Sequence, residues 1–201
     1  MEEYIFKIII LGSGGVGKSS LIRRFTTKIF TKDYISGIGV EIHTRIIYVN
    51  DITIRFILFD TAGQEYYTKL RPTYYMGARA VSVVFDVTNE KTFEDAKDWW
   101  KESHLPEKIP GILIGNKIDL IESRMITSEM GETLAKELKL SYIETSAKTG
   151  ENVGRSFYKL VFMILEKYSV PLSKALCPYC GTVAYILKRE QLCYNCNNRI
   201  E

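Results

Sequence analysis

The chain has no hydrophobic run long enough to cross a membrane. Its longest apolar runs, such as residues 8–11 and 160–165, fall far short of the roughly 20 residues required. It also has no marked excess of one charge, since 27 Lys and Arg against 24 Asp and Glu give a net charge of +3. This balance gives no electrostatic reason to expect a nucleic-acid or membrane partner. The first residues are acidic and lack the small-residue cleavage site of a secretory signal, so we expect a cytoplasmic protein.

Cysteine is missing from most of the chain, because all four cysteines lie within the last 25 of its 201 residues. Their position excludes a disulfide framework for the main body. The hydrophobic fraction of 46% and the charged fraction of 25% are those of an ordinary soluble globular protein, which excludes a disordered or fibrous class. The length fits one domain with a small appendage.

Apolar runs that end in glycine or polar residues alternate with segments of helical periodicity along the first 168 residues. The pattern predicts strands at residues 4–11, 40–49, 52–59, 80–87, 111–115 and 141–144. It predicts helices at residues 19–27, 127–138 and 151–168, with another around residues 93–100. This alternation is typical of an α/β sheet covered by helices on both faces. We therefore expect a main domain at residues 1–168, a linker at 169–176 and a tail at 177–201.

Residues 12–19 read G-S-G-G-V-G-K-S and match the pattern G-x-x-x-x-G-K-S, between a predicted strand and a predicted helix. Glycines allow such a loop to curl with its N–H groups pointing inward, so that it binds phosphate at a helix N-terminus. Lys18 adds a positive charge for the β and γ phosphates, and the Ser19 hydroxyl is expected to bind Mg²⁺. The residues expected to contact the nucleotide here are Gly14, Gly15, Val16, Gly17, Lys18, Ser19 and Ser20.

Two further motifs indicate a guanine base. Residues 116–119, N-K-I-D, follow a predicted strand at the edge where open α/β sheets bind ligands. The Asp119 carboxylate can accept the N1 and 2-amino N–H groups of guanine, whereas adenine lacks both donors. Residues 145–148, T-S-A-K, complete the site if the Ala147 N–H meets guanine O6. The residues expected to contact the base are Asn116, Lys117, Asp119, Ser146, Ala147 and Lys148.

Residues 60–65 read D-T-A-G-Q-E and, with the motifs above, resemble the Ras superfamily of small GTPases over about residues 4–168. The similarity is closest to the Rab family through residues 38–41, 74–78 and 83–86. It implies a P-loop GTPase fold with a mostly parallel six-stranded sheet and helices on both faces. It also implies a monomer that binds GTP or GDP with Mg²⁺, hydrolyses GTP, and binds protein effectors and regulators through switch I and switch II.

The resemblance assigns roles to matching residues. Asp60 would hold Mg²⁺ through water, and Phe30 matches the aromatic residue beside the guanine. Catalysis would depend on Gln64, which orients the attacking water, on the Gly63 N–H, which senses the γ-phosphate, and on Lys18. The sequence positions no arginine as a catalytic finger, so intrinsic hydrolysis is expected to be slow.

The chain departs from the family in both switches. A switch I threonine that binds Mg²⁺ is replaced by Gly37, whose N–H can still reach the γ-phosphate. We expect weaker Mg²⁺ retention and slower or more partner-dependent hydrolysis; the alternative is that water replaces the hydroxyl with little loss. The aromatic triad through which Rabs present their switch surface corresponds to Ile42, Phe59 and Tyr74. Two of these differ from the usual phenylalanine and tryptophan, so the partners of the family do not carry over directly.

The tail contains two C-x-x-C pairs separated by twelve residues, a spacing that fits four thiolates on one structural Zn²⁺. The predicted ligands are Cys177, Cys180, Cys193 and Cys196. The segment resembles a zinc ribbon, with residues 183–187 and 191–192 as a small hairpin between the pairs. Disulfides, a redox dithiol and an iron site are the alternatives.

Rab proteins usually end in prenylated cysteines, whereas this sequence ends N-N-R-I-E and has Glu at position 2. We therefore expect no lipid anchor and, where the protein meets a membrane, recruitment through a partner or through the tail. One alternative function is a nucleic-acid-associated GTPase whose tail contacts RNA or DNA, although the tail carries few basic residues. Another is a GTP-binding module with negligible hydrolysis, which Gly37 favours and Gln64 opposes.

Overall fold

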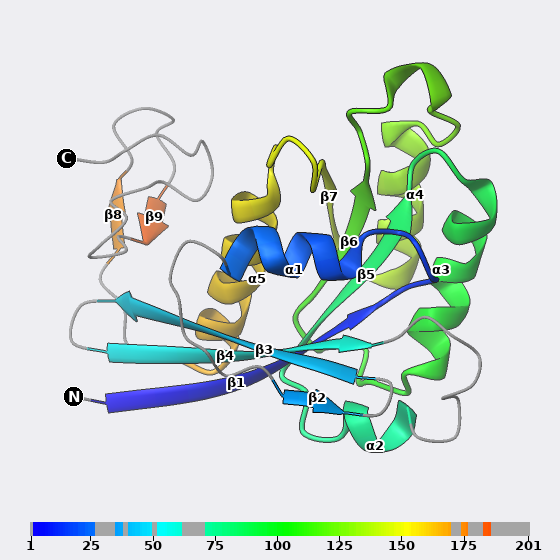
Figure 1. The fold of residues 1–201 in the computed structure, drawn as a ribbon. Helices are drawn as coiled ribbons and strands as arrows, with labels where there is room; N and C mark the ends of the chain where they lie inside the picture. Colours follow the sequence, from blue (N-terminus) through cyan, green and yellow to red (C-terminus); the bar gives the residue numbers. More distant parts are fainter. Residues whose placement is uncertain are drawn as a thin grey trace.

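The computed structural model describes residues 2–26, 35–37, 40–49, 52–61, 71–169, 174–176 and 183–185. The main body is a seven-stranded sheet covered by helices on both faces (Figure 1). The strands of this sheet are β1 (Glu2–Leu11), β2 (Ile35–Gly37), β3 (Val40–Val49), β4 (Ile52–Thr61), β5 (Ala80–Asp86), β6 (Gly111–Asn116) and β7 (Ser141–Thr145). The α-helices are α1 (Lys18–Thr26), α2 (Arg71–Tyr75), α3 (Glu90–Glu102), α4 (Ser128–Leu138) and α5 (Val153–Lys167).

The strand order is β2-β3-β4-β1-β5-β6-β7. Strands β4, β1, β5, β6 and β7 run parallel. At one edge, β3 pairs antiparallel with β4, and β2 pairs antiparallel with β3. The six predicted strands and the mostly parallel arrangement are therefore confirmed, but the predicted number of strands is too low by one. The additional strand, β2, has three residues, which is too short to show the alternation of apolar and polar residues that marks a strand in a sequence.

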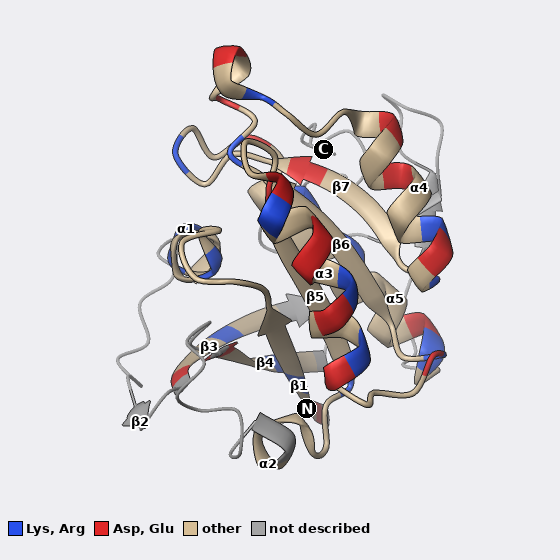
Figure 2. Ribbon diagram, turned by 90° about the vertical axis from the view of Figure 1, so that its right-hand side faces the viewer, with Lys and Arg blue, Asp and Glu red and all other residues tan. Residues whose placement is uncertain are grey.

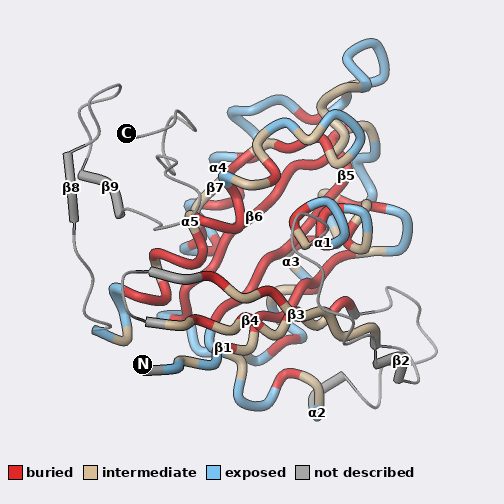
Figure 3. The backbone as a smooth tube through the Cα atoms, turned by 60° about the vertical axis from the view of Figure 1, so that its left-hand side comes forward, coloured by how far each residue is buried: buried red, intermediate tan, exposed pale blue. Residues whose placement is uncertain are grey.

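Successive residues of the strands supply two separate cores. Ile8 and Ile10 of β1 pack in a cluster with α1 and α5, whereas Ile9 and Leu11 pack in a second cluster with α2, α3 and α4. This alternation follows from the period of two in a strand, which points neighbouring side chains to opposite faces. Strands β5 and β6 are buried at every residue, and they form the centre of the molecule in Figure 3.

A buried arginine joins β3 to two helices. Arg45 is 3% exposed, and its guanidinium donates hydrogen bonds to the Phe25 carbonyl at the end of α1 and to the Tyr158 hydroxyl of α5, the latter over 3.0 Å. The guanidinium also lies 4.6 Å from the centre of the Phe25 ring, within the range of a cation–π contact. Arg45 thus fixes the end of α1, where the chain leaves the helix.

The tail contains a second, two-stranded sheet. Strand β8 (Lys174–Leu176) pairs antiparallel with β9 (Val183–Tyr185). Residues 174–176 were expected in the linker, so this part of the expected linker is a strand, held by its pairing with β9. The predicted partner of residues 183–187, residues 191–192, lies outside the described residues. Among the described helices, none combines the length and the hydropathy needed to cross a membrane.

Candidate functional site

The carboxyl ends of the parallel strands meet at one edge of the sheet. In the register of the sheet, Asn116 at the end of β6 lies between Asp86 of β5 and Thr145 of β7. Asp60 of β4 faces Ile10, one residue before the end of β1. The residues predicted to bind phosphate, Mg²⁺ and base follow these ends, as expected for a ligand site in an open α/β sheet.

The phosphate loop, residues 12–17, connects β1 to α1, which begins at Lys18. Gly17 has a φ angle of 98°, and a Cβ at this position would lie 2.4 Å from Asn116 Nδ2, so no larger residue fits there. A Cβ at Gly14 or Gly15 would instead meet nothing within 4 Å. The loop is closely packed on its inner side and open on the other, which is the shape that a phosphate cradle needs.

Lys18, Ser19 and Asp60 lie together beside this loop. Lys18 is 6% exposed, and its Nζ donates to the carbonyl oxygens of Gly12 at 2.7 Å and Ser13 at 2.9 Å. The Ser19 side chain is hydrogen-bonded to the Asp60 carboxylate. Burial raises the pKa of Asp60, and the Ser19 hydrogen bond and the Lys18 charge offset this only in part. A hydroxyl and a buried carboxylate side by side form a donor set that fits a hard cation such as Mg²⁺.

Asn116 connects the phosphate loop to the base motifs. Its side chain is 1% exposed, and Nδ2 donates to the Val16 carbonyl oxygen over 2.8 Å. Its Oδ1 accepts from Thr145 Oγ1 and from the Ala147 N–H, each over 3.1 Å. Three segments that are far apart in the sequence are therefore held together by one buried amide.

Asp119 is positioned by the T-S-A-K segment. Ser146 Oγ donates to Asp119 Oδ1 over 2.5 Å, and Lys148 Nζ lies 3.9 Å from Asp119 Oδ2. The Asp119 side chain is 13% exposed, whereas that of Lys148 is 79% exposed. The Lys148 carbonyl oxygen accepts from Arg24 of α1 over 3.0 Å, so this loop is also joined to the first helix.

Lys117 has a partner that its motif alone does not indicate. Its Nζ lies 2.6 Å from Asp86 Oδ2, and it adopts a positive φ of 71°. Burial acts to raise the pKa of Asp86, but hydrogen bonds from Lys117 and from the Thr88 N–H and hydroxyl outweigh it, so the pKa is lowered. The sequence does contain a signal for Asp86, since a carboxylate at the end of a buried strand lies where such sheets bind ligands.

A second contact missed from the sequence braces the phosphate loop from α3. The Ser13 hydroxyl donates to Asp95 Oδ2 over 3.0 Å and accepts from Trp99 Nε1 over 3.1 Å. Asp95 is also paired with Lys91 over 2.9 Å. Ser13 occupies one of the free positions of the loop pattern, so the motif itself gives no reason to expect this contact.

The remaining predicted site residues lie in β2, β3 and β4, in α1 and α2, or outside the described residues. Gly37 ends β2 and faces Val40 of β3, and Ser20 is exposed in the first turn of α1. Ile42 faces Phe59 across the β3–β4 pair, and Tyr74 lies in α2. The predicted site residues that fall outside the described residues are Phe30, Gly63, Gln64, Cys177, Cys180, Cys193 and Cys196.

Comparison with known proteins gives a consistent result. Residues 7–166 match the family model described as the Ras family. The chain is 40% identical over 167 residues to the Ras-related protein SEC4 of Saccharomyces cerevisiae, an alignment that covers 82% of this chain and 77% of that protein. It is 36% identical over 167 residues to the human Ras-related protein Rab-8B, covering 82% and 81% of the two chains. It is 37% identical over 179 residues to the Ras-related protein RIC1 of Oryza sativa subsp. japonica, covering 88% and 89%.

Proposed function

The chain belongs to the Ras family of small GTPases, close to its Rab members, and hydrolyses GTP; on this premise we propose that it is a regulatory switch. In the proposed cycle, the GTP and GDP states present different switch I and switch II surfaces, so that protein partners bind one state and release the other. The relatives named Rab support a role in membrane trafficking, in which this chain would reach its membrane through a protein partner.

The predicted site residues divide into groups with different proposed tasks. Lys18 and the N–H groups of residues 12–17 bind the β and γ phosphates, while Ser19 holds Mg²⁺ directly and Asp60 holds it through water. When bound, Mg²⁺ neutralises charge on these phosphates. Asp119, with Ser146 behind it, accepts the guanine N–H groups, and this pairing selects guanine because adenine offers no donors there. Gln64 and Gly63 complete the proposed hydrolytic machinery.

The hydrogen bonds of Asn116 are the main support for this proposal, because they join the phosphate loop and the base motifs into one site.

The experiment is single-turnover hydrolysis of GTP and ATP by the purified full chain with Mg²⁺. We expect slow hydrolysis of GTP and none of ATP. Asp119→Ala should abolish the preference for guanine, and Gln64→Ala should slow hydrolysis with little change in GTP affinity. Equal turnover of both nucleotides would refute the assignment.

Gly37 bears on the speed of the proposed cycle. Because glycine offers no hydroxyl, we propose that Mg²⁺ is retained less firmly in the GTP state and that hydrolysis depends more on a partner. Gly37→Thr should then slow Mg²⁺ release and raise the single-turnover rate. A variant that changes neither would show that water replaces the missing ligand.

The four tail cysteines remain a predicted zinc site, and we propose that Zn²⁺ folds the tail as a structural ion. Metal analysis of the purified chain distinguishes zinc from iron, and disulfides would leave the four tail cysteines without metal. The nucleic-acid alternative receives no support from the described surface, where acidic and basic residues are interspersed along α3 and α4 (Figure 2).

A further inference from the structure

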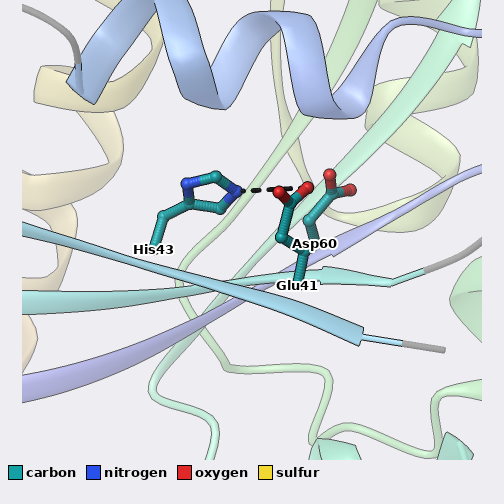
Figure 4. A group of neighbouring side chains, drawn as sticks. All are labelled: Glu41, His43 and Asp60. Carbon is teal, nitrogen blue, oxygen red and sulfur yellow. Dashed lines mark ion pairs between the residues drawn. The ribbon is translucent and has the colours of Figure 1, made fainter. Parts of the chain in front are cut away.

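Three metal-ligating side chains lie together where β3 and β4 pair. Glu41 faces Asp60 directly across the antiparallel pair, and His43 lies two residues further along β3, on the same face of the sheet. Figure 4 shows the imidazole directed at the Glu41 carboxylate, with the Asp60 carboxylate beside it. One ligand atom from each of the three residues lies within 4.8 Å of the other two, and His43 Nε2 is 3.5 Å from Glu41 Oε2.

The arrangement places two negative charges opposite each other in a sheet, which is unfavourable without a compensating cation. Asp60 is 5% exposed, and the side chains of Glu41 and His43 are 21% and 13% exposed, so water screens this pair only in part. The guanidinium of Arg23 approaches Glu41 at 3.9 Å, but its side chain is 64% exposed. Lys18 directs its ammonium to the carbonyl groups of the phosphate loop, and its charge offsets the effect of burial on the pKa of Asp60 only in part. A cation held between the three residues would remove the repulsion from the buried end of the cluster.

We propose that Glu41, His43 and Asp60 bind a divalent transition-metal ion of the zinc class, at a second site beside that of the nucleotide's Mg²⁺, with which it shares Asp60. Zinc binds imidazole nitrogen and carboxylate oxygen at about 2.0–2.2 Å, so neighbouring ligand atoms of a tetrahedral site lie about 3.3–3.5 Å apart. The separation of His43 Nε2 and Glu41 Oε2, 3.5 Å, already has this value. All three ligand atoms lie within 4.8 Å of one another, so small side-chain shifts would bring them to this spacing, and water would complete the fourth position.

The ligand types select the metal. Imidazole suits zinc, copper, nickel and iron, whereas Mg²⁺ prefers an all-oxygen shell that retains several waters. Since the ligands come from two strands, a bound ion would cross-link β3 to β4 beside the short edge strand β2, whose Ser36 faces Glu41. Because the site contains an imidazole, millimolar Mg²⁺ is expected to compete poorly for it.

The first test uses the wild-type full chain with Mg²⁺ and GDP. The sequence contains only two histidines, His43 and His104, so the imidazole region of an NMR spectrum reports each of them separately. His104 is exposed after α3 and serves as the internal control. On addition of Zn²⁺ to tens of micromolar, we expect the His43 resonances to shift and those of His104 to stay. Unchanged His43 resonances would overturn the proposal.

The second test counts zinc after equilibrium dialysis of three proteins: wild type, His43→Gln and the matched control His104→Gln. Zinc bound by the tail cysteines, or by the nucleotide in place of Mg²⁺, is common to all three and cancels in the comparison. We expect wild type and His104→Gln to bind one ion that His43→Gln binds at least about tenfold more weakly, because loss of a ligand costs no less than loss of a supporting residue. Equal zinc binding by all three proteins would contradict the site. The NMR experiment decides the question without any variant if His43→Gln does not fold.

Discussion

Asn116 offers a sharp test of how the nucleotide site is built. Asn116→Ala removes three hydrogen bonds at once and leaves the Val16 carbonyl, the Thr145 hydroxyl and the Ala147 N–H without this partner. Because Asn116 is 1% exposed, water does not readily replace the amide. At about 1 kcal/mol for each hydrogen bond, the expected loss is roughly 3 kcal/mol. If all of it appears in binding, the affinity for GDP falls about 100-fold, since 1.4 kcal/mol corresponds to a factor of ten.

The assay is titration with fluorescent GDP, together with urea unfolding with and without nucleotide. The matched control is Thr127→Ala, which removes the hydroxyl that accepts from Met130 N over 3.3 Å at the start of α4. That cap contributes about 1 kcal/mol to stability, and its hydroxyl makes no hydrogen bond to the nucleotide motifs among the described residues, so GDP affinity should stay unchanged. If Asn116→Ala binds GDP within threefold of wild type and unfolds at the same urea concentration, the network does not organise the site.

Three further results are expected from the described structure. Asp60→Asn should stabilise the nucleotide-free, metal-free chain against urea by about 0.2–1 kcal/mol, because it removes the negative charge that faces Glu41. The same substitution should weaken Mg²⁺ binding. A variant that unfolds at lower urea would contradict this reasoning. Arg45→Met should lower the free energy of unfolding by about 2–3 kcal/mol, because the Tyr158 hydroxyl and the Phe25 carbonyl at the end of α1 lose the arginine donor. A loss below about 0.5 kcal/mol in thermal unfolding would rule out this role. The pKa of Asp86 is lowered in the folded state, so the ionised carboxylate stabilises the fold above its unfolded pKa of about 3.9. This contribution disappears as the pH falls through the pKa of the folded state. Asp86→Asn should therefore lose less stability than wild type when the pH is lowered below 4.

Much of the fold could be predicted because its signals are local. Alternation and glycine-bounded runs located six strands, and the phosphate-loop pattern located the start of α1 within one residue. The contacts made by Ser13 could not be predicted in this way. They depend on how α3 packs beside the phosphate loop, which brings Asp95 and Trp99 to a position about 80 residues earlier in the chain. A motif indicates which residues contact the ligand, whereas the packing of a helix on the sheet determines which residues support the motif.

The Glu41–His43–Asp60 cluster could be predicted from the sequence only in part. Period two in a strand places Glu41 and His43 on one face without any structure. Whether Asp60 faces them depends on the register of the hairpin, and the structure pairs Val49 with Ile52, which leaves two residues between the strands. Counting outward eight residues from that pair brings Glu41 opposite Asp60. Because a two-residue connection fixes the register of an antiparallel pair, the sequence already contained this juxtaposition. The short distance between the His43 imidazole and the Glu41 carboxylate could not be predicted, because it depends on side-chain rotamers. The zinc titration of His43 therefore tests this arrangement of side chains and not the sequence pattern alone.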